Sequence, residues 1–305
     1  MTRMRRLMAG GLATLALTGP VGAQAPAVER RPELTTLLGR EVFARGDADG
    51  AIAAADAALA ADPRNVDLVL AAARARDAAL QFHAAIDLYG RGLALAPRDV
   101  RLWRFRGHRY ISIRRFDLAV ADLEQAAALA PTSFDVRYHL GLAHYLRGDY
   151  DAAARAYQAC LDATTPGPLP SGWRSCTTTR ATANDRVAIS DWLYRSLRRA
   201  GRHEDAKALL APFAAGLTVG ENEAYYTALR FYRGDVDEVT ALTPATKNEN
   251  RLVTIGYGLA VHAGANGDGE RACELLQRIA AEPNWNAFGV IAAEADLARS
   301  PGLCR

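Results

Sequence analysis

The sequence lacks the short motifs that mark several familiar enzyme classes. It contains no Gly-x-Ser-x-Gly, no His-Glu-x-x-His and no phosphate-binding glycine loop. Only Lys207 and Lys247 supply lysine among the 305 residues, and the four cysteines form no Cys-x-x-Cys pair. These absences argue against esterases of that pattern, zinc proteases, P-loop enzymes and thioredoxin-like proteins. We therefore predict that the protein is not an enzyme and has no catalytic residues, no cofactor and no metal site.

The sequence also lacks an excess of either charge. Its 37 basic residues exceed its 34 acidic residues by three. That excess disappears when Arg3, Arg5 and Arg6 are assigned to a removable leader, which leaves 34 basic residues against 34 acidic ones. A mature protein near neutrality has no global attraction for nucleic acid or for an anionic membrane. We predict that nucleic acid is not a partner.

Residues 1–23 have the pattern of a cleavable signal peptide. Three arginines are followed by the apolar run Leu7 to Gly19, Pro20 breaks the helix, and Val21-Gly22-Ala23 offers a small-residue cleavage site. The apolar run is too short to span a bilayer comfortably, and we find no later apolar segment of transmembrane length. We therefore predict an exported, periplasmic protein that is soluble after cleavage and has no stable membrane anchor.

A 34-residue repeat organises much of the remaining chain. Pro63, Pro97 and Pro131 recur at this interval, each after an Ala-rich stretch. Four alanines keep the same spacing, namely Ala51, Ala85, Ala119 and Ala153. Helical pairs that repeat at a fixed period in this range stack into a solenoid, because no single pair can bury its apolar face alone.

The most complete repeat resembles the tetratricopeptide repeat family. The residues that carry the resemblance are Trp103, Gly107, Tyr110, Ala119, Ala126 and Pro131. The resemblance implies an all-α fold, a right-handed α-solenoid of about seven helix pairs plus a C-terminal capping helix. We assign residues 24–32 to a lead-in segment and 33–162 to clear repeats. Gly46 and Gly148 are expected in the turns between paired helices, where Arg114 occupies the corresponding position of the third unit.

The repeat pattern breaks in residues 163–185 and then returns in weaker form. Three prolines and two glycines between Pro166 and Gly172 prevent a helix there, which predicts an insertion containing Trp173. Residues 186–305 are expected to form degenerate helical repeats and a cap. The predicted final helix, Phe288 to Arg299, carries Leu297 and the polar residues Glu294 and Asp296, which suit a cap.

The four cysteines suggest two disulfides in an oxidising compartment, although four cysteines allow three pairings. We favour Cys160 with Cys176, which would pin the insertion, and Cys273 with Cys304, which would fasten the last helix. Buried free thiols are the alternative, because Cys160 and Cys273 both occupy positions where packing would bury them.

One face of the third and fourth repeats combines arginines with aromatic rings at helical spacing. The resemblance implies that this side lines a concave groove in which peptides lie. Such a face suits an acidic or aromatic-bearing segment, while an ordinary solvated helix face is the alternative interpretation. The candidate partner-binding residues are Arg101, Arg104, Phe105, His108, Tyr138, His139 and Tyr145.

Two further features of this region leave alternatives open. Arg106 stands where the first and fourth repeats have leucine, so it needs a partner, and both Asp87 and Asp122 qualify. The histidines at 108, 139 and 144 could in principle hold zinc, but we interpret them as core or groove residues.

The resemblance implies a non-catalytic scaffold of the cell envelope that binds a partner segment in the groove. The alternative is an enzyme or enzyme accessory in which the 163–185 insertion covers the groove as a lid. A buried Asp/Glu–His pair beneath the insertion would favour that alternative, and an open groove lined by Arg and Tyr would favour binding. Self-association through the ends of the array is a third hypothesis.

Overall fold

The computed structural model describes residues 31–179, 182–245 and 249–304. The predicted signal peptide (1–23) and most of the predicted lead-in (24–32) lie outside the described residues. Pro32 to Arg305 forms one unit in the contact pattern of the chain. Within the described residues, none of the helices combines the length and apolar character needed to cross a bilayer.

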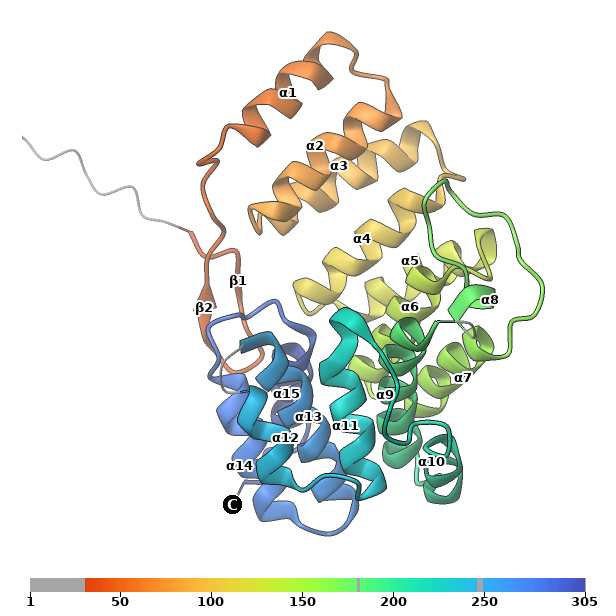
Figure 1. Ribbon diagram of the computed structural model, residues 1–305. Coiled ribbons are helices and arrows are strands. Elements are labelled where there is room, and N and C mark those ends of the chain that lie inside the picture. Colours follow the sequence, from red (N-terminus) through yellow and green to blue (C-terminus); the bar gives the residue numbers. More distant parts are fainter. Residues whose placement is uncertain (1–30, 180–181, 246–248, 305) are drawn as a thin grey trace, which may run out of the picture. The chain divides into compact units, whose positions relative to one another are not determined.

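The described residues are mostly helical, and their helices follow one another as short hairpins (Figure 1). The N-terminal elements are β1 (Leu34–Thr35), β2 (Glu41–Val42), α1 (Ala51–Ala61), α2 (Val66–Ala78), α3 (Phe82–Leu95), α4 (Val100–Ser112), α5 (Phe116–Leu129), α6 (Phe134–Arg147) and α7 (Tyr150–Leu161). The C-terminal elements are α8 (Cys176–Thr179), α9 (Ala183–Arg199), α10 (His203–Leu209), η1 (Gly220–Asn222), α11 (Glu223–Arg233), α12 (Glu238–Ala245), α13 (Glu249–Ala265), α14 (Gly269–Ala280) and α15 (Phe288–Arg299).

Helices pair as α2 with α3, α4 with α5, α6 with α7, α9 with α10, α11 with α12 and α13 with α14, and consecutive pairs contact each other. The first helices of the pairs also contact one another, as α4 does with α6 and α6 with α9. These first helices form what we call the inner face. The all-α solenoid expected from the repeat period is therefore confirmed, with six complete pairs in the described residues.

The 34-residue spacing arises from the way each first helix begins. Asn65, Asp99 and Ser133 each cap a helix by accepting hydrogen bonds from backbone N–H groups of its first turn. Each cap lies two residues after one of the recurring prolines, which ends the previous helix. A side-chain cap contributes about 1 kcal/mol, so the same three-residue signal both stops one helix and starts the next.

Small residues at one repeat position allow the two helices of a pair to approach closely. A Cβ on Gly107 would lie 2.7 Å from Cγ of Leu123, and one on Gly141 would lie 2.5 Å from the ring of Tyr157. Both glycines lie in the middle of a helix, where glycine costs about 1 kcal/mol relative to alanine. The close packing of α4 on α5 and of α6 on α7 offsets that cost.

The first predicted repeat differs from the expectation, because residues 33–50 form no helix. Leu34–Thr35 pairs with Glu41–Val42 as an antiparallel hairpin. Gly39, at φ +83°, lies in its turn. Val42 is buried against Phe82 and Trp285, so the segment is held by apolar contacts from distant parts of the chain. Only α1, the second helix of the predicted pair, is formed.

The insertion folds back onto the start of α6. Ser133 and Ser175 form an isolated β-bridge, and the backbone N–H of Phe134 donates to the carbonyl of Arg174 over 3.0 Å. Cys160 is joined to Cys176, and Cys273 to Cys304, which is the pairing favoured from the sequence. The first disulfide links α7 to the insertion, and the second links α14 to the residues after α15.

The C-terminal helix α15 does not face solvent as a polar cap. It packs against α13, α14 and α6. Glu294 is 1% exposed and Asp296 is 5% exposed, so the polar residues of this last helix are buried. Glu294 instead accepts hydrogen bonds from the buried guanidinium of Arg114, in the turn between α4 and α5. Figure 1 shows α15 beside the β1–β2 hairpin, from which Arg40 reaches Glu294 at 3.7 Å.

Arg114 adopts a left-handed conformation, φ +61°, in a turn where Gly148 occupies the equivalent position one repeat later. A non-glycine residue in this region costs roughly 1–2 kcal/mol. Arg114 Nη2 donates to Glu294 over 2.8 Å and to the carbonyl of Trp285 over 2.8 Å. These long-range contacts explain why an arginine occupies a glycine position.

Candidate functional site

The structure brings together five of the seven residues predicted to bind a partner. Arg104, Phe105 and His108 come from α4, and Tyr138 and His139 come from α6. The rings of His108 and His139 lie 4.4 Å apart, and Arg104 Nη2 lies 3.4 Å from Nε2 of His139. The repeat spacing therefore places these side chains next to one another on the inner face.

The other two predicted residues lie apart from this group. Arg101, at the start of α4, forms ion pairs with Asp99 and with Asp67 of α2. Tyr145, near the end of α6, is 1% exposed and its hydroxyl bonds that of Tyr257 over 2.9 Å. Tyr145 is therefore a core residue of the C-terminal half rather than part of a surface.

Burial also removes Tyr138 and His139 from any open surface. Tyr138 is 8% exposed and His139 is 5% exposed. Tyr138 shares a hydrogen bond of 2.9 Å with Tyr225 of α11, and His139 packs at 5.8 Å against Phe288 of α15. The C-terminal pairs cover this part of the inner face, which the sequence predicted as an open groove.

Burial controls the charge of the histidines at this site. Desolvation, followed by the nearby guanidinium groups, holds the pKa of His108 and of His139 well below the usual value, so both are neutral at pH 7. His139 Nδ1 lies 2.6 Å from the backbone carbonyl of Asp135, and its Nε2 faces Arg104. Neither interaction is the carboxylate–histidine pair that would have favoured catalysis.

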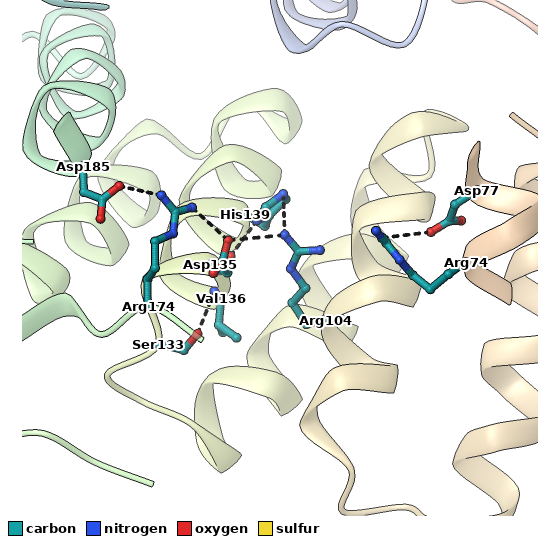
Figure 2. A network of polar contacts seen from close by, with 9 residues as sticks. All are labelled: Arg74, Asp77, Arg104, Ser133, Asp135, Val136, His139, Arg174 and Asp185. Atoms are coloured by element: carbon teal, nitrogen blue, oxygen red, sulfur yellow. Dashed lines mark hydrogen bonds and ion pairs between the residues drawn. The ribbon is translucent and has the colours of Figure 1, made fainter. Parts of the chain in front are cut away.

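A polar network ties the insertion to this face (Figure 2). Asp135, on α6, accepts a hydrogen bond from Arg174 over 3.2 Å and lies 3.6 Å from Nη2 of Arg104. Arg174 also bonds Asp185 of α9 over 2.5 Å. The neighbouring Trp173 places its ring edge-on to Phe105, with centroids 6.3 Å apart. The insertion therefore borders the inner face and is fixed there by ion pairs.

Arg104 keeps its charge although it is nearly enclosed. Burial lowers its pKa to about 10, and the carboxylate of Asp135 opposes that shift. Its guanidinium carbon lies 4.7 Å from the centroid of the Phe105 ring. Arg104 therefore remains a cation at neutral pH, held beside an aromatic face.

Arg74 on α2 is a site residue that the sequence reasoning missed. Its guanidinium carbon lies 4.5 Å from the centroid of the Phe105 ring, and its side chain is 51% exposed. The sequence contained a signal that could have identified it. Arg74 precedes His108 by one repeat of 34 residues and so occupies the same position on the inner face. Arg74, Arg104 and Phe105 together form what we call the arginine–phenylalanine patch.

The contacts answer the question of which residue pairs with Arg106. Arg106 forms a two-pronged ion pair with Asp122, at 2.7 and 2.9 Å, which leaves Asp87 without that role. The residues that the structure describes contain no cluster of three or more His, Cys, Asp and Glu side chains able to hold a metal ion.

The comparisons with known proteins agree with this architecture. Residues 106–168 match the family model for the tetratricopeptide repeat. Small glutamine-rich tetratricopeptide repeat-containing protein 2 of Saccharomyces cerevisiae is 30% identical over 81 residues, which is 27% of this chain and 23% of that protein. The match to the tetratricopeptide repeat family therefore lies in the third and fourth repeats of this chain.

Several solved structures are similar to this chain at low sequence identity. A tetratricopeptide repeat protein from Parabacteroides merdae has a TM-score of 0.49 at 14% identity, with 82% of this chain and 93% of that chain covered. The MamA protein has a TM-score of 0.45 at 19% identity, covering 63% and 87% of the two chains. YrrB, described as having an unusual peptide-binding site, has a TM-score of 0.44 at 13% identity, covering 78% and 97%.

Proposed function

We propose that this protein is a non-catalytic scaffold of the cell envelope that binds an acidic, aromatic-bearing segment of a partner protein. The observation that carries the proposal is the arginine–phenylalanine patch, in which Phe105 lies within 5 Å of the guanidinium groups of Arg74 and Arg104. The patch lies on α2 and α4. A tetratricopeptide repeat fold supports a role in protein interaction. The patch supports a partner segment that carries carboxylates and aromatic side chains.

The charges around the patch favour an anionic partner. Arg74 lies 3.5 Å from Asp77, and Asp77 also lies 3.7 Å from Arg109, so two guanidinium groups share one carboxylate. Arginine beside an aromatic ring suits a carboxylate that arrives with an aromatic side chain, through charge-assisted hydrogen bonds and stacking. The exposed half of the Arg74 side chain is the accessible donor.

The exposed face of α2 is a better candidate contact surface than the wider groove predicted from the sequence. The exposed positions of α2 include Asp67, Ala71, Arg74 and Ala78, which recur at helical spacing. The two alanines, Ala71 and Ala78, have small side chains and do not fill the surface beside Arg74. The equivalent face of α6 is buried under the C-terminal pairs, so we place the contact surface on α2 and α4.

Peptide binding measured by fluorescence anisotropy tests this surface. A labelled peptide rich in Glu and Tyr should bind the mature protein, and a version with Lys in place of Glu should not. Arg74→Glu should weaken binding by about tenfold or more, because a charge-assisted hydrogen bond is lost and repulsion replaces it. Phe105→Leu should weaken binding less, since it keeps the apolar volume and removes only the aromatic face.

Arg155→Glu is the matched control, because it makes the same charge change on the exposed side of α7. It should bind the peptide within about twofold of the unaltered protein, the difference expected of a distant, screened charge. Equal losses in both variants would indicate unspecific charge attraction, and full binding by Arg74→Glu would rule out the patch.

The proposed location rests on two features that point the same way. The N-terminal pattern is that of a signal peptide, and two disulfides lie in the chain, which persist in oxidising compartments. Cell fractionation with N-terminal sequencing tests this. We expect a periplasmic protein that begins at Gln24, and a cytoplasmic protein that begins at Met1 would contradict the proposal.

A further inference from the structure

A cavity lies between α4 and the C-terminal helix pairs that pack against it. Its volume is about 320 Å³, and its walls come from α4, α9, α11, α13 and the segment leading into α15. This is within the size range of sites for small organic molecules. The cavity is separate from the arginine–phenylalanine patch, because neither Arg74 nor Arg104 nor Phe105 lines it.

Arginine side chains supply the charge of this cavity. Arg109 and Arg195 both line it, whereas the described residues of its lining include no Asp or Glu. Their counter-ions are not among these lining residues, since Arg109 is 3.7 Å from Asp77 and Arg195 pairs with Asp191. The inner surface therefore presents hydrogen-bond donors and positive charge to whatever occupies it.

Several donor groups of the wall have no hydrogen-bond partner among the described residues. Arg195 is fully buried, and its Nε and Nη1 are unpartnered, while Nη2 donates to the carbonyl of Thr254 over 3.0 Å. His108 Nδ1 is also without a partner. Buried polar atoms of this kind have a hydrogen-bond partner in nearly all folded proteins, and an acceptor bound in the cavity would supply one to the Arg195 guanidinium.

Aromatic rings and amides complete the lining. Phe288 packs beside His108 with ring centroids 5.3 Å apart, and Trp192 lies under the guanidinium of Arg195 at 4.6 Å. Asn286 borders the cavity in the segment before α15. A planar apolar body would pack against the rings, while a carboxylate would accept hydrogen bonds from the arginines.

We propose that this cavity binds a small organic carboxylate with a planar apolar body. The ligand would contact α4 and the segment before α15 at once, and so would stabilise the closed arrangement of the C-terminal pairs. This site is independent of the proposed peptide-binding function, because it uses different residues and a different ligand class.

Carboxylates and their neutral amides provide the sharpest test on the unaltered protein. Isothermal titration and thermal unfolding would compare indole-3-acetate with indole-3-acetamide, and benzoate with benzamide. We expect at least one carboxylate to bind about tenfold or more tightly than its amide and to raise the unfolding temperature. Equal binding of acid and amide, or no binding by either carboxylate, would overturn the proposal. Inorganic phosphate binding as well as the carboxylates would also overturn it, since that result indicates an unspecific anion site.

Asn286→Asp locates the binding event within this cavity. The new carboxylate would repel the ligand, and we expect about tenfold weaker binding. Asn65→Asp is the matched control, because it adds the same charge at the cap of α2, where Asp caps a helix as well as Asn does. Arg155→Glu, on the exposed side of α7, should also leave carboxylate binding unchanged. Tight binding by Asn286→Asp would place the ligand elsewhere, and the acid–amide comparison decides the proposal even if this variant does not fold.

Discussion

The N-terminal and C-terminal pairs of the solenoid bury different kinds of side chain. Around α2 and α3 the core consists of small separate clusters, such as Leu59 with Val69 and Ala72. From α4 to α15 one continuous apolar cluster runs through every pair. That region also buries charged residues, including Asp191 and Arg195, which are both 0% exposed.

This difference follows from which parts of the chain are in contact. The N-terminal pairs mainly touch their neighbours in sequence, so a regular repeat satisfies them. The C-terminal pairs also touch helices far away in sequence, as Tyr257 of α13 does when it bonds Tyr145 of α6 and Asp296 of α15. The regular repeats therefore specify contacts between neighbouring helix pairs. The irregular repeats also specify contacts between helices that are far apart in the sequence.

Breaking the ion pair that joins α15 to the turn between α4 and α5 should have the largest effect. Glu294→Gln leaves the guanidinium of Arg114 buried without its counter-charge, and we expect a loss of about 3–5 kcal/mol in the free energy of unfolding. Asp56→Asn is the control from the N-terminal pairs, because the Asp56–Arg76 pair is partly exposed and should change stability by about 1 kcal/mol or less. Urea unfolding measures both, and similar losses would contradict the comparison.

Removing the disulfide that links α7 to the insertion should have the next largest effect. The Cys160–Cys176 bridge closes a loop with a sequence separation of 16, and losing it should cost about 3 kcal/mol in the chain-entropy description. The double variant with serine at both positions tests this by thermal unfolding. Alkylation without reductant, followed by mass analysis, should modify none of the four cysteines, and four modified cysteines would rule out both bridges.

A substitution within a regular pair should have a smaller effect. Gly141→Ala places a Cβ against the ring of Tyr157, so we expect overpacking to cost about 1–3 kcal/mol, offset in part by the better helix propensity of alanine. Gly46→Ala is the control, because no atom lies within 4 Å of a Cβ there. Chemical unfolding should separate the two variants, and equal stability would show that the pair can relax.

The pH dependence of the C-terminal pairs allows a further test of the comparison. Burial and the nearby Arg198 lower the pKa of His262 to about 4, and its Nδ1 bonds Tyr194 over 2.8 Å. The unfolded chain binds a proton below about pH 6.5 while the folded protein does not. This contribution to stability is therefore complete above pH 6.5 and falls as the pH drops toward 4.

His262→Gln isolates this contribution, because the variant should lose less stability between pH 6.5 and 4 than the unaltered protein. The difference matters because Asp191, whose pKa burial raises to about 6, acts in the opposite direction below that pH. NMR titration of the imidazole should report a pKa near 4. A value near 6.5 would show that the ring is solvated.

Much of the fold was predictable wherever local signals repeat. Three kinds of local signal specify these helices. Asp99 and Ser133 cap them, the prolines before these caps end the previous helices, and Gly107 allows close packing within its pair. The hairpin formed by residues 34–42 was not predictable in this way, because Val42 is held by Phe82 and Trp285 rather than by its neighbours.

The sequence indicated some of the residues of the candidate site, but it did not indicate how much of the face is accessible. Arg104 and Phe105 were found because helical spacing places them on one face. Tyr138, His139 and Tyr145 follow the same spacing, yet the C-terminal pairs bury them. The periodicity of a helix shows which residues share a face, but it contains no information about what later covers that face.

The sequence by itself determined the helix pairs of the regular repeats, their period and the residues of the inner face, because each of these depends on short-range spacing. Only the tertiary structure decided that α15 returns to α6 and that Arg114 meets Glu294. Those contacts join residues far apart in the chain, and their free energy depends on shape and desolvation that no local pattern encodes.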